Sequence, residues 1–239
     1  MNKGSFDVST VTAAILAGGL GTRLKPVIAD RPKVMAEVRG RPFLSYLLDQ
    51  LQAAGFGDVV LCTGYLGEQI DSAFGDSYGR LQLRYSREKQ PLGTGGALRL
   101  AHRYLTSNPI LVMNGDSICA ADLNAFCEWH HAGPSKASLL LSRVANNERY
   151  GGVEIDGNGV VTEFAEKGKN VRLNWINGGV YLLEREVFLS IPEGTPVSLE
   201  YDIFPRLVGH GLYGYPSRGR FLDIGTPEDY SIAEAFFSQ

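Results

Sequence analysis

The stretch that decides the fold is "TAAILAGGLGTRLKP", residues 12–26, in which an apolar run leads into three glycines and then into cationic residues. The run at 12–17 is nearly continuous in apolar residues, which is typical of a strand buried on both faces of a sheet. Gly18, Gly19 and Gly21 allow positive φ angles and let backbone N–H groups approach a ligand closely. The stretch therefore predicts a buried strand that ends in an anion-binding loop, although a plain turn could use the same glycines.

Two familiar phosphate-binding loops do not match this stretch. A P-loop ends in Gly-Lys-Ser/Thr, whereas Gly21 is followed by Thr22 and Arg23. A dinucleotide fingerprint that started at Gly19 would require a third glycine where the chain has Leu24. Arg23 still offers a bidentate fork that suits phosphate oxygens. The loop is consequently expected to bind phosphate in a manner of its own.

The first half of the chain alternates strand and helix patterns. Apolar runs predict strands at 12–17, 58–63, 81–86 and 109–116. Helical spacing of apolar residues predicts helices at 42–55, 93–105 and 121–133, with Gly55 ending the first of them. This order implies a mostly parallel sheet with right-handed crossovers.

The pattern changes after Lys136. Strand-like runs with turn signals occupy 136–144, 151–156, 159–167 and 174–184, and helices are expected at 198–211 and 226–239. Thr226 and Pro227 are typical of an N-cap and a first helical residue. We therefore predict an α/β fold over residues 1–239. It is a single Rossmann-like, three-layer domain whose central sheet is mostly parallel and becomes mixed toward the C-terminal half.

Composition and cysteine usage narrow the class of protein. The chain is 44% apolar and 21% charged with a formal net charge of −3, which does not suggest nucleic acid or an anionic membrane as a partner. The three cysteines have no spacing typical of a disulfide framework or a zinc site. Without an evident leader or an apolar run of membrane length, the protein is expected to be cytoplasmic. We predict small buried thiols at Cys62 and Cys119, and helix-surface positions without a role at His102, His130 and His131.

Three further charged residues point to phosphate chemistry. Lys33 follows Pro32, Asp116 ends a buried apolar run in "NGD", and Asp223 precedes a helix start in "FLDIGTPEDY". Ligands of open α/β sheets bind beyond the carboxyl ends of the strands, where the glycine loop and "NGD" should both lie. Mg²⁺ favours one or two carboxylates together with substrate phosphates. Each residue alone could be a surface lysine, a turn or a cap; together they predict a metal-assisted enzyme that acts on phosphates.

The motifs "LAGGLGTRLKP", "RPKVMAEV", "PLGTGGAL", "NGD", "FAEKG", "NGGVY" and "DIGTPEDY", in this order, resemble those of the sugar-1-phosphate nucleotidyltransferases. The resemblance runs from about Val11 to Phe237. Members of this family join a sugar 1-phosphate to a nucleoside triphosphate, giving a nucleotide sugar and pyrophosphate, with Mg²⁺. The resemblance implies a nucleotide-binding half at about 11–135 and a sugar-phosphate-binding half at about 136–239.

The resemblance also assigns roles by position. It implies nucleotide contacts at Leu16, Gly18, Gly19, Gly21, Thr22, Arg23, Gln90 and Gly93. It implies sugar-phosphate contacts at Gly151, Glu166, Lys167 and Asn177, although Glu166 and Lys167 could also be a solvated charge pair. It gives catalytic roles to Arg23, Lys33, Asp116 and Asp223, with the two aspartates as Mg²⁺ ligands. The departure of the chain at Ala29–Asp30 leaves open the shape of the loop between Arg23 and Lys33.

Within the family, the chain is most similar to members that use GTP and a heptose 1-phosphate, in the motifs "VIADRPKVMA", "GYLGEQI", "PLGTGGA", "VSLEYDIFPRL" and "FLDIGTPEDY". Mannose, glucose or N-acetylhexosamine 1-phosphate with GTP or UTP are alternatives, because Gln90 can hydrogen-bond to either base. A non-catalytic nucleotide-sensing relative would not need the aspartate pair. A glycosyltransferase would be expected to carry an Asp-x-Asp motif, which "NGDSI" is not. The sequence is compatible with a homo-oligomer without indicating one.

Overall fold

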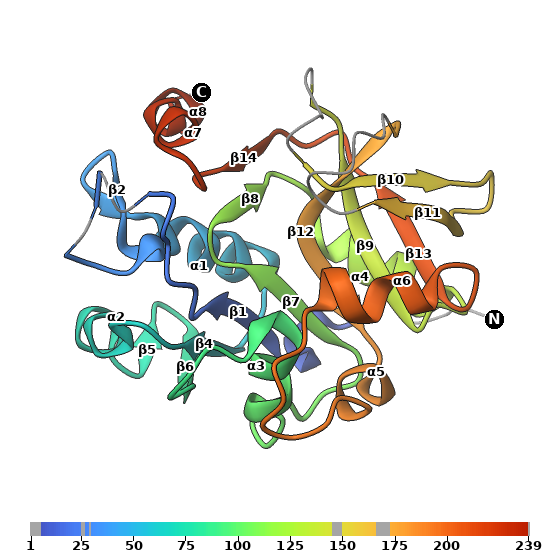
Figure 1. Ribbon diagram of the computed structural model, residues 1–239, viewed down its shortest axis with the longest axis horizontal. Coiled ribbons are helices and arrows are strands. Elements are labelled where there is room, and N and C mark those ends of the chain that lie inside the picture. The colour runs from blue at the N-terminus through green and yellow to red at the C-terminus, as the bar shows by residue number, and fades with distance from the viewer. Residues whose placement is uncertain (1–5, 25–26, 29, 145–149, 166–172, 239) are drawn as a thin grey trace.

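The computed structural model describes residues 6–24, 27–28, 30–144, 150–165 and 173–238 (Figure 1). Within them, one sheet of ten strands has the order β11-β10-β12-β7-β1-β4-β6-β5, and β9 joins it beside β12, with β13 pairing to β9. Its strands are β1 (Ala13–Ala17), β4 (Asp58–Thr63), β5 (Ser77–Tyr78), β6 (Leu81–Arg87), β7 (Ile110–Asn114), β9 (Ala137–Ser142), β10 (Gly152–Ile155), β11 (Val161–Ala165), β12 (Trp175–Leu183) and β13 (Leu212–Pro216). Two further pairs lie outside this sheet, β2 (Glu37–Val38) with β3 (Arg41–Pro42) and β8 (Ser117–Cys119) with β14 (Phe221–Asp223).

The strand directions confirm the predicted mixture. In the first half, β1 is parallel to β4 and β7, and β4 is parallel to β6. In the second half, β12 is antiparallel to both β7 and β9, and β10 is antiparallel to β11 and β12. β13 returns parallel to β9. The sheet is thus parallel around β1 and mixed toward the C-terminal half.

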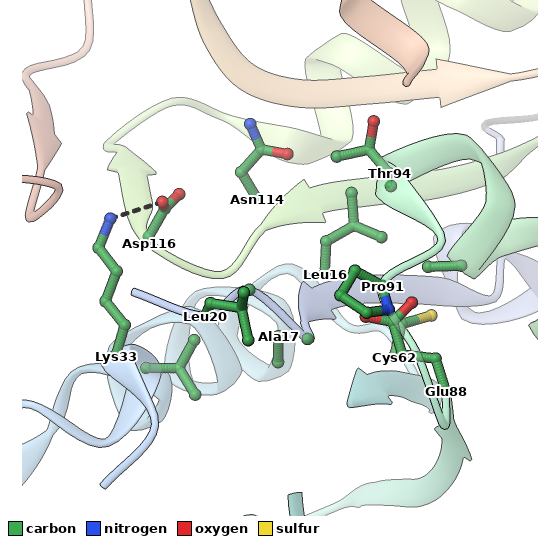
Figure 2. A pocket seen from close by; sticks show the side chains of 15 residues that line it. Leu16, Ala17, Leu20, Lys33, Cys62, Glu88, Pro91, Thr94, Asn114 and Asp116 are labelled. Carbon is green, nitrogen blue, oxygen red and sulfur yellow. Dashed lines mark hydrogen bonds and ion pairs between the residues drawn. The ribbon is translucent and has the colours of Figure 1, made fainter. Parts of the chain in front are cut away.

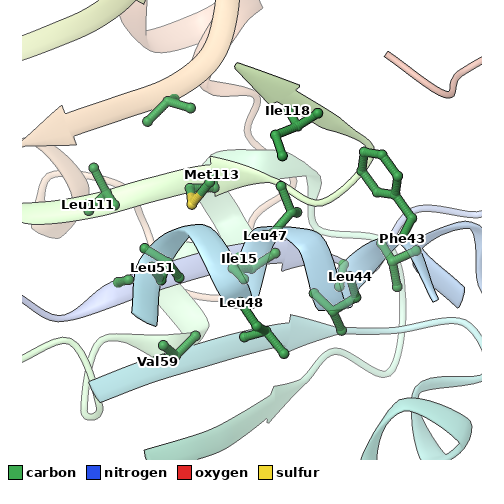
Figure 3. Close-up of a cluster of buried hydrophobic side chains, with 14 of the residues drawn as sticks. Ile15, Phe43, Leu44, Leu47, Leu48, Leu51, Val59, Leu111, Met113 and Ile118 are labelled. Atoms are coloured by element: carbon green, nitrogen blue, oxygen red, sulfur yellow. The ribbon is translucent and has the colours of Figure 1, made fainter. Parts of the chain in front are cut away.

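Helices cover both faces of the sheet. Consecutive residues of a strand face opposite sides, and in the buried strands the residues on both sides are apolar. In β1, Ile15 belongs to one hydrophobic cluster and Ala14 to the other. The Ile15 side packs against α1 (Phe43–Ala54), α4 (Leu123–Ala132) and α8 (Ala233–Phe236). Figure 3 shows the part of this cluster that lies between α1 and the strands. The Ala14 side packs against α3 (Gly93–Ala101), α5 (Arg185–Leu189) and α6 (Phe204–Leu207). Because strands such as β1 are apolar on both faces, helices pack on both sides of the sheet, which gives the three-layer α/β architecture.

Helix α1 shows how the sequence pattern sets its own packing. Leu44, Leu47, Leu48 and Leu51 recur at helical spacing and are fully buried against the strands, as Figure 3 shows. The helix ends where Gly55 takes a φ of 95°, a left-handed conformation in which a side chain would be strained. Prediction and structure agree here within one residue at each end.

Other elements differ from the predicted boundaries. The helix predicted at 198–211 is a π-helical turn, Leu199–Ile203, followed by the single turn of α6, and β13 then begins at Leu212. The helix predicted at 226–239 divides into α7 (Pro227–Ser231) and α8, with Thr226 capping α7 by accepting the Asp229 N–H. The helix α2 (Gly67–Phe74) had no predicted counterpart.

The predicted thiols are buried, whereas one histidine prediction is wrong. Cys62 and Cys119 are buried, and burial raises the pKa of the Cys62 thiol to about 12. His130 lies inside the protein rather than on a helix surface, and its ring contacts the Ser138 hydroxyl at 2.7 Å and the Glu184 carboxylate at 3.2 Å. The last turn of α4 therefore faces β9, and these two partners satisfy the ring nitrogens.

Candidate active site

Two cavities meet at the carboxyl ends of the parallel strands. The glycine-loop cavity, about 280 Å³, is lined by Leu16, Ala17, Gly18, Gly19, Leu20, Lys33, Val34, Cys62, Glu88, Pro91, Gly93, Thr94, Ala97, Asn114 and Asp116 (Figure 2). The β12 cavity, about 260 Å³, is lined by Asn114, Asp116, Ser117, Tyr150, Gly151, Asn177, Gly179, Glu200, Tyr201, Phe221 and Asp223. Asn114 and Asp116 line both cavities, so the two spaces share one wall at the end of β7.

A lysine lies between two carboxylates at this shared wall. The Lys33 ammonium is 2.7 Å from Asp116 Oδ2 and 4.0 Å from Asp223 Oδ1 (Figure 2 shows the shorter contact). Asp223 Oδ1 also accepts a hydrogen bond of 2.6 Å from the Gly225 N–H. A Cβ at Gly225 would lie 2.6 Å from that carboxylate oxygen, so only glycine leaves room for this approach.

The backbone brings these three residues together from distant parts of the chain. Asp116 follows β7 directly, and Asp223 ends β14, which pairs with β8 so that Asp223 faces Ser117. The Ile224 N–H then donates a hydrogen bond of 2.9 Å to the Asp116 carbonyl. Lys33 begins the short 3₁₀ turn Lys33–Met35 after Pro32. The structure therefore assembles Lys33, Asp116 and Asp223, three of the residues that the sequence analysis singled out.

The glycine loop contributes space to its cavity. Gly18 and Gly19 line the cavity, as does Leu16 at the end of β1. A Cβ at Gly18 would lie 2.7 Å from Glu88 Oε1, which is closer than such atoms approach in proteins. Gly21 has a φ of 58°, where a side chain would be strained. Thr22 and Arg23, in contrast, are exposed in a turn beyond the cavity wall.

Glu88 is a cavity residue that the sequence analysis missed. It directly follows β6, lines the glycine-loop cavity, and accepts a hydrogen bond of 3.0 Å from the Leu92 N–H through Oε2. Burial raises the pKa of its carboxyl group. Gln90, the residue predicted to contact the base, is exposed and lines neither cavity. The signal that sequence analysis missed was the position of Glu88, directly after a strand of the same parallel set.

The β12 cavity contains two of the predicted sugar-phosphate residues. Gly151 and Asn177 line it, whereas Glu166 and Lys167 lie outside the described residues. Asn177 Oδ1 accepts a hydrogen bond from the Gly179 N–H at 3.0 Å, and its Nδ2 donates to the Tyr181 hydroxyl at 2.9 Å. Gly179 has a φ of 71° and approaches Asn114 closely. Asn177 is thereby fixed in orientation at the cavity wall.

The parallel sheet, the glycine loop and the paired cavities define an α/β protein with a candidate ligand site at the carboxyl edge of its sheet. Residues 12–239 match the nucleotidyl transferase family. The chain belongs to this family, whose members are nucleotidyltransferase enzymes.

Individual relatives show the same relationship. The D-glycero-alpha-D-manno-heptose 1-phosphate guanylyltransferase of Aneurinibacillus thermoaerophilus is 38% identical over 93% of this chain and 96% of its own length. The mannose-1-phosphate guanylyltransferase of Mycobacterium tuberculosis is also 38% identical, over 92% of this chain. The chain spans only 62% of the length of that second relative. Among solved structures, HddC from Yersinia pseudotuberculosis is 34% identical with a TM-score of 0.83, covering 95% of this chain and all of its own.

The described residues include no group of three or more histidine, cysteine or acidic side chains arranged to hold a metal. Two acidic side chains of the site, Asp116 and Asp223, approach the same cation, the Lys33 ammonium. In the same part of the chain, none of the helices combines the length and the apolar character needed to cross a membrane.

Proposed function

We propose that this chain is a sugar-1-phosphate guanylyltransferase, which joins a sugar 1-phosphate to the guanylyl group of GTP and releases pyrophosphate. The observation that carries the proposal is the pair of cavities that meet at Lys33, Asp116 and Asp223. Two substrates that react with each other need adjoining sites and a shared wall where their phosphates meet. The glycine-loop cavity is built from residues 16–116, and most of the β12 cavity comes from beyond residue 136, which supports the division into two halves.

The chemistry explains why these residue types suit the reaction. The phosphate of the sugar has a second pKa of about 6, so it is mostly ionised at neutral pH and needs no catalytic base. The obstacle is the repulsion between this anion and the α-phosphate that it attacks. Catalysis then depends on alignment and on neutralising charge. Lys33 lies where a cation can offset phosphate charge, while the backbone of the glycine loop would hold the triphosphate.

The aspartate pair fits a magnesium ion. Asp116 and Asp223 both approach one cation, the Lys33 ammonium, and carboxylate oxygens are hard ligands of the kind that Mg²⁺ prefers. One or two carboxylates completed by substrate phosphates are sufficient for this ion. When bound, Mg²⁺ would supply positive charge at the α-phosphate. Asp116 and Asp223 would hold it, and Lys33 would turn toward the phosphates.

Glu88 supports GTP over UTP. Guanine presents N–H donors on its Watson–Crick edge, and an ionised carboxylate is an acceptor for such donors. Uracil presents two carbonyl oxygens and one N–H, so a carboxylate facing it would repel an oxygen. Glu88 Oε2 is held by the Leu92 N–H, and Oε1 lies toward Gly18 at the cavity wall. The guanylyltransferase relatives, and an HddC structure described as complexed with GMP-PN, support the same base.

For the sugar, we favour D-glycero-α-D-manno-heptose 1-phosphate, with mannose 1-phosphate as the second candidate. Two of the relatives are heptose 1-phosphate guanylyltransferases, which are 38% and 36% identical to this chain. The mannose-1-phosphate guanylyltransferase of Mycobacterium tuberculosis, also 38% identical, makes mannose 1-phosphate the second candidate.

The test is a matrix of GTP, UTP, dTTP and ATP against heptose, mannose, glucose and N-acetylglucosamine 1-phosphates, scored by pyrophosphate release with Mg²⁺. GTP with one of the two manno-configured sugars should give the highest kcat/KM. Glu88→Gln should lower the ratio of kcat/KM for GTP to kcat/KM for UTP by at least about tenfold, which is what one hydrogen bond to a charged group contributes. Pyrophosphate release with no pair of substrates would refute the proposed function. Release with UTP rather than GTP would refute the choice of base.

A further inference from the structure

The carboxylate of Glu200 lines the β12 cavity and is held by three hydroxyl groups. Thr94 Oγ1 and Ser198 Oγ donate hydrogen bonds to its Oε2 at 2.7 and 2.9 Å, and the Tyr181 hydroxyl donates to its Oε1 at 3.1 Å. These donors come from α3, from the N-cap of the π-helical turn and from β12. A carboxylate held from three sides has a fixed position and orientation.

The motif "GTGG" at residues 93–96 makes this arrangement sterically possible. The N–H groups of Gly95 and Gly96 donate to the Val197 carbonyl at 2.9 and 3.1 Å, and the Leu199 N–H donates to Thr94 Oγ1 at 2.7 Å. A Cβ at Gly96 would lie 2.6 Å from the Thr195 carbonyl oxygen. The missing side chains therefore let the segment that carries Glu200 lie directly against α3.

Tyr181 orients the Oε1 atom of the Glu200 carboxylate. Its ring is buried, and its hydroxyl accepts hydrogen bonds from Asn177 Nδ2 at 2.9 Å and Asn114 Nδ2 at 3.3 Å. Because both of these neighbours donate, the Tyr181 proton is directed at Glu200. Burial and the nearby Glu200 charge raise the pKa of Tyr181 well above its usual range, so the phenol keeps that proton.

We propose that Glu200 is a specificity-determining residue of the sugar-phosphate site, where its Oε1 accepts a hydrogen bond from a sugar hydroxyl. The inference rests on the proposed function, because it assigns the β12 cavity to the sugar. Oε2 accepts two of the three hydrogen bonds described above and Oε1 only one, and each carboxylate oxygen has two acceptor positions. A carboxylate also repels a phosphate. Glu200 therefore orients the sugar with its hydroxyls toward β12 and its phosphate toward Lys33.

The test compares wild type with Glu200→Gln and Tyr181→Phe, using mannose 1-phosphate, the heptose 1-phosphate and the 2-, 3- and 4-deoxy analogues of mannose 1-phosphate. Glu186→Gln is the matched control, since Glu186 is an exposed acid that pairs with Lys136. Glu200→Gln should raise the KM for sugar 1-phosphate by about 10–100-fold, the worth of a hydrogen bond to a charged group, and leave the KM for GTP within about twofold. Tyr181→Phe keeps the carboxylate, so we expect a smaller rise in the same KM.

The deoxy analogues separate recognition of a hydroxyl from a structural role. In wild type, one analogue should lose at least about tenfold in kcat/KM, and Glu200→Gln should lose almost nothing further with that analogue. Equal penalties for every analogue in wild type and in both variants would overturn the proposal. Calorimetric binding of mannose 1-phosphate gives a readout that does not need turnover. If wild type binds mannose 1-phosphate but releases no pyrophosphate, the proposed reaction is refuted. Weaker binding of mannose 1-phosphate by Glu200→Gln than by wild type would still support the role of Glu200. Equal binding by the two proteins would refute that role.

Discussion

Replacing Lys33 with methionine removes the ammonium group that lies between Asp116 and Asp223 and keeps most of the side-chain stem. The Lys33 and Asp223 side chains are each only 10% exposed, whereas the Asp116 side chain is 39% exposed. In the variant, the buried carboxylate of Asp223 faces the carboxylate of Asp116 without the cation that separates them. We expect the protein to fold, to lose stability and to become more responsive to divalent ions.

The distances set the size of the effect. With an effective dielectric constant of about 20, charges 2.7 and 4.0 Å apart attract by about 6 and about 4 kcal/mol. Desolvation offsets most of this attraction, and removing one member of a buried ion pair costs about 3–5 kcal/mol. Because water reaches Asp116, we expect a loss near the lower end, about 3 kcal/mol. For a domain of this size, that corresponds to a fall in Tm of about 6–12 °C.

Magnesium makes the test specific. An ion bound by the two carboxylates of the variant should restore stability, by about 2.7 kcal/mol when its concentration is 100 times its Kd. Thermal unfolding with and without MgCl₂ should therefore show a larger magnesium-dependent rise in Tm for Lys33→Met than for wild type. Lys136→Met is the control, since Lys136 pairs with Glu186 on an exposed surface. A Tm for Lys33→Met equal to that of wild type, or an equal response to magnesium in both proteins, would refute this account of the cluster.

Three other predictions concern single side chains. Asp116→Asn should still fold but lower kcat by about 100–1,000-fold, and a near-normal rate of pyrophosphate release would contradict its role. Burial raises the pKa of the Glu88 carboxyl group, so this group binds its proton more tightly in the folded protein than in the unfolded chain. Part of the stability of the folded protein is therefore lost as pH rises through the folded-state pKa of Glu88. In urea unfolding, Glu88→Gln should thus be more stable than wild type at pH 7, and the difference should vanish at acidic pH; a less stable variant at pH 7 would contradict this. Burial lowers the pKa of His130 from 6.5, so the stability of the wild-type protein should fall as pH drops below that value. Urea unfolding at a series of pH values tests this, and an equal fall in the stability of His130→Gln would contradict the role of His130.

The parallel half of the fold was predictable because its signals are local. The helical spacing of Leu44, Leu47, Leu48 and Leu51 and the stop at Gly55 fix α1 without reference to the rest of the chain. The region 198–211 was predicted less well, because its apolar spacing resembles a helix. Its backbone is held instead by contacts with α3, such as the hydrogen bond from the Leu199 N–H to Thr94. Pairing with β9 then makes a strand of Leu212–Pro216. Tertiary contacts of this kind override local preference.

The candidate site was predictable as far as strand ends allow. Asp116 and the glycine loop end neighbouring parallel strands, so the order of elements alone places them at one edge. Asp223 reaches that edge on a strand of three residues that pairs with β8, and so short a run carries little signal of its own. Glu88 lies in the polar sequence "SREKQ", where its burial beside Gly18 cannot be read. Glu200 depends on packing between α3 and a turn that lies about 100 residues later in the chain.

The described part of the site contains four carboxylates, although the proposed substrates are anions. The partners of these carboxylates explain how acids and anionic substrates can share one site. Among the described residues, two of these four carboxylates, those of Asp116 and Asp223, form salt bridges with Lys33. Glu88 and Glu200 are held instead by an N–H group and by hydroxyls. A carboxylate pair that already faces a cation can accept a divalent ion with its phosphates, whereas carboxylates held by neutral donors favour neutral N–H and O–H groups. The distribution of partners therefore favours phosphates at the shared wall, the base at Glu88 and the sugar at Glu200.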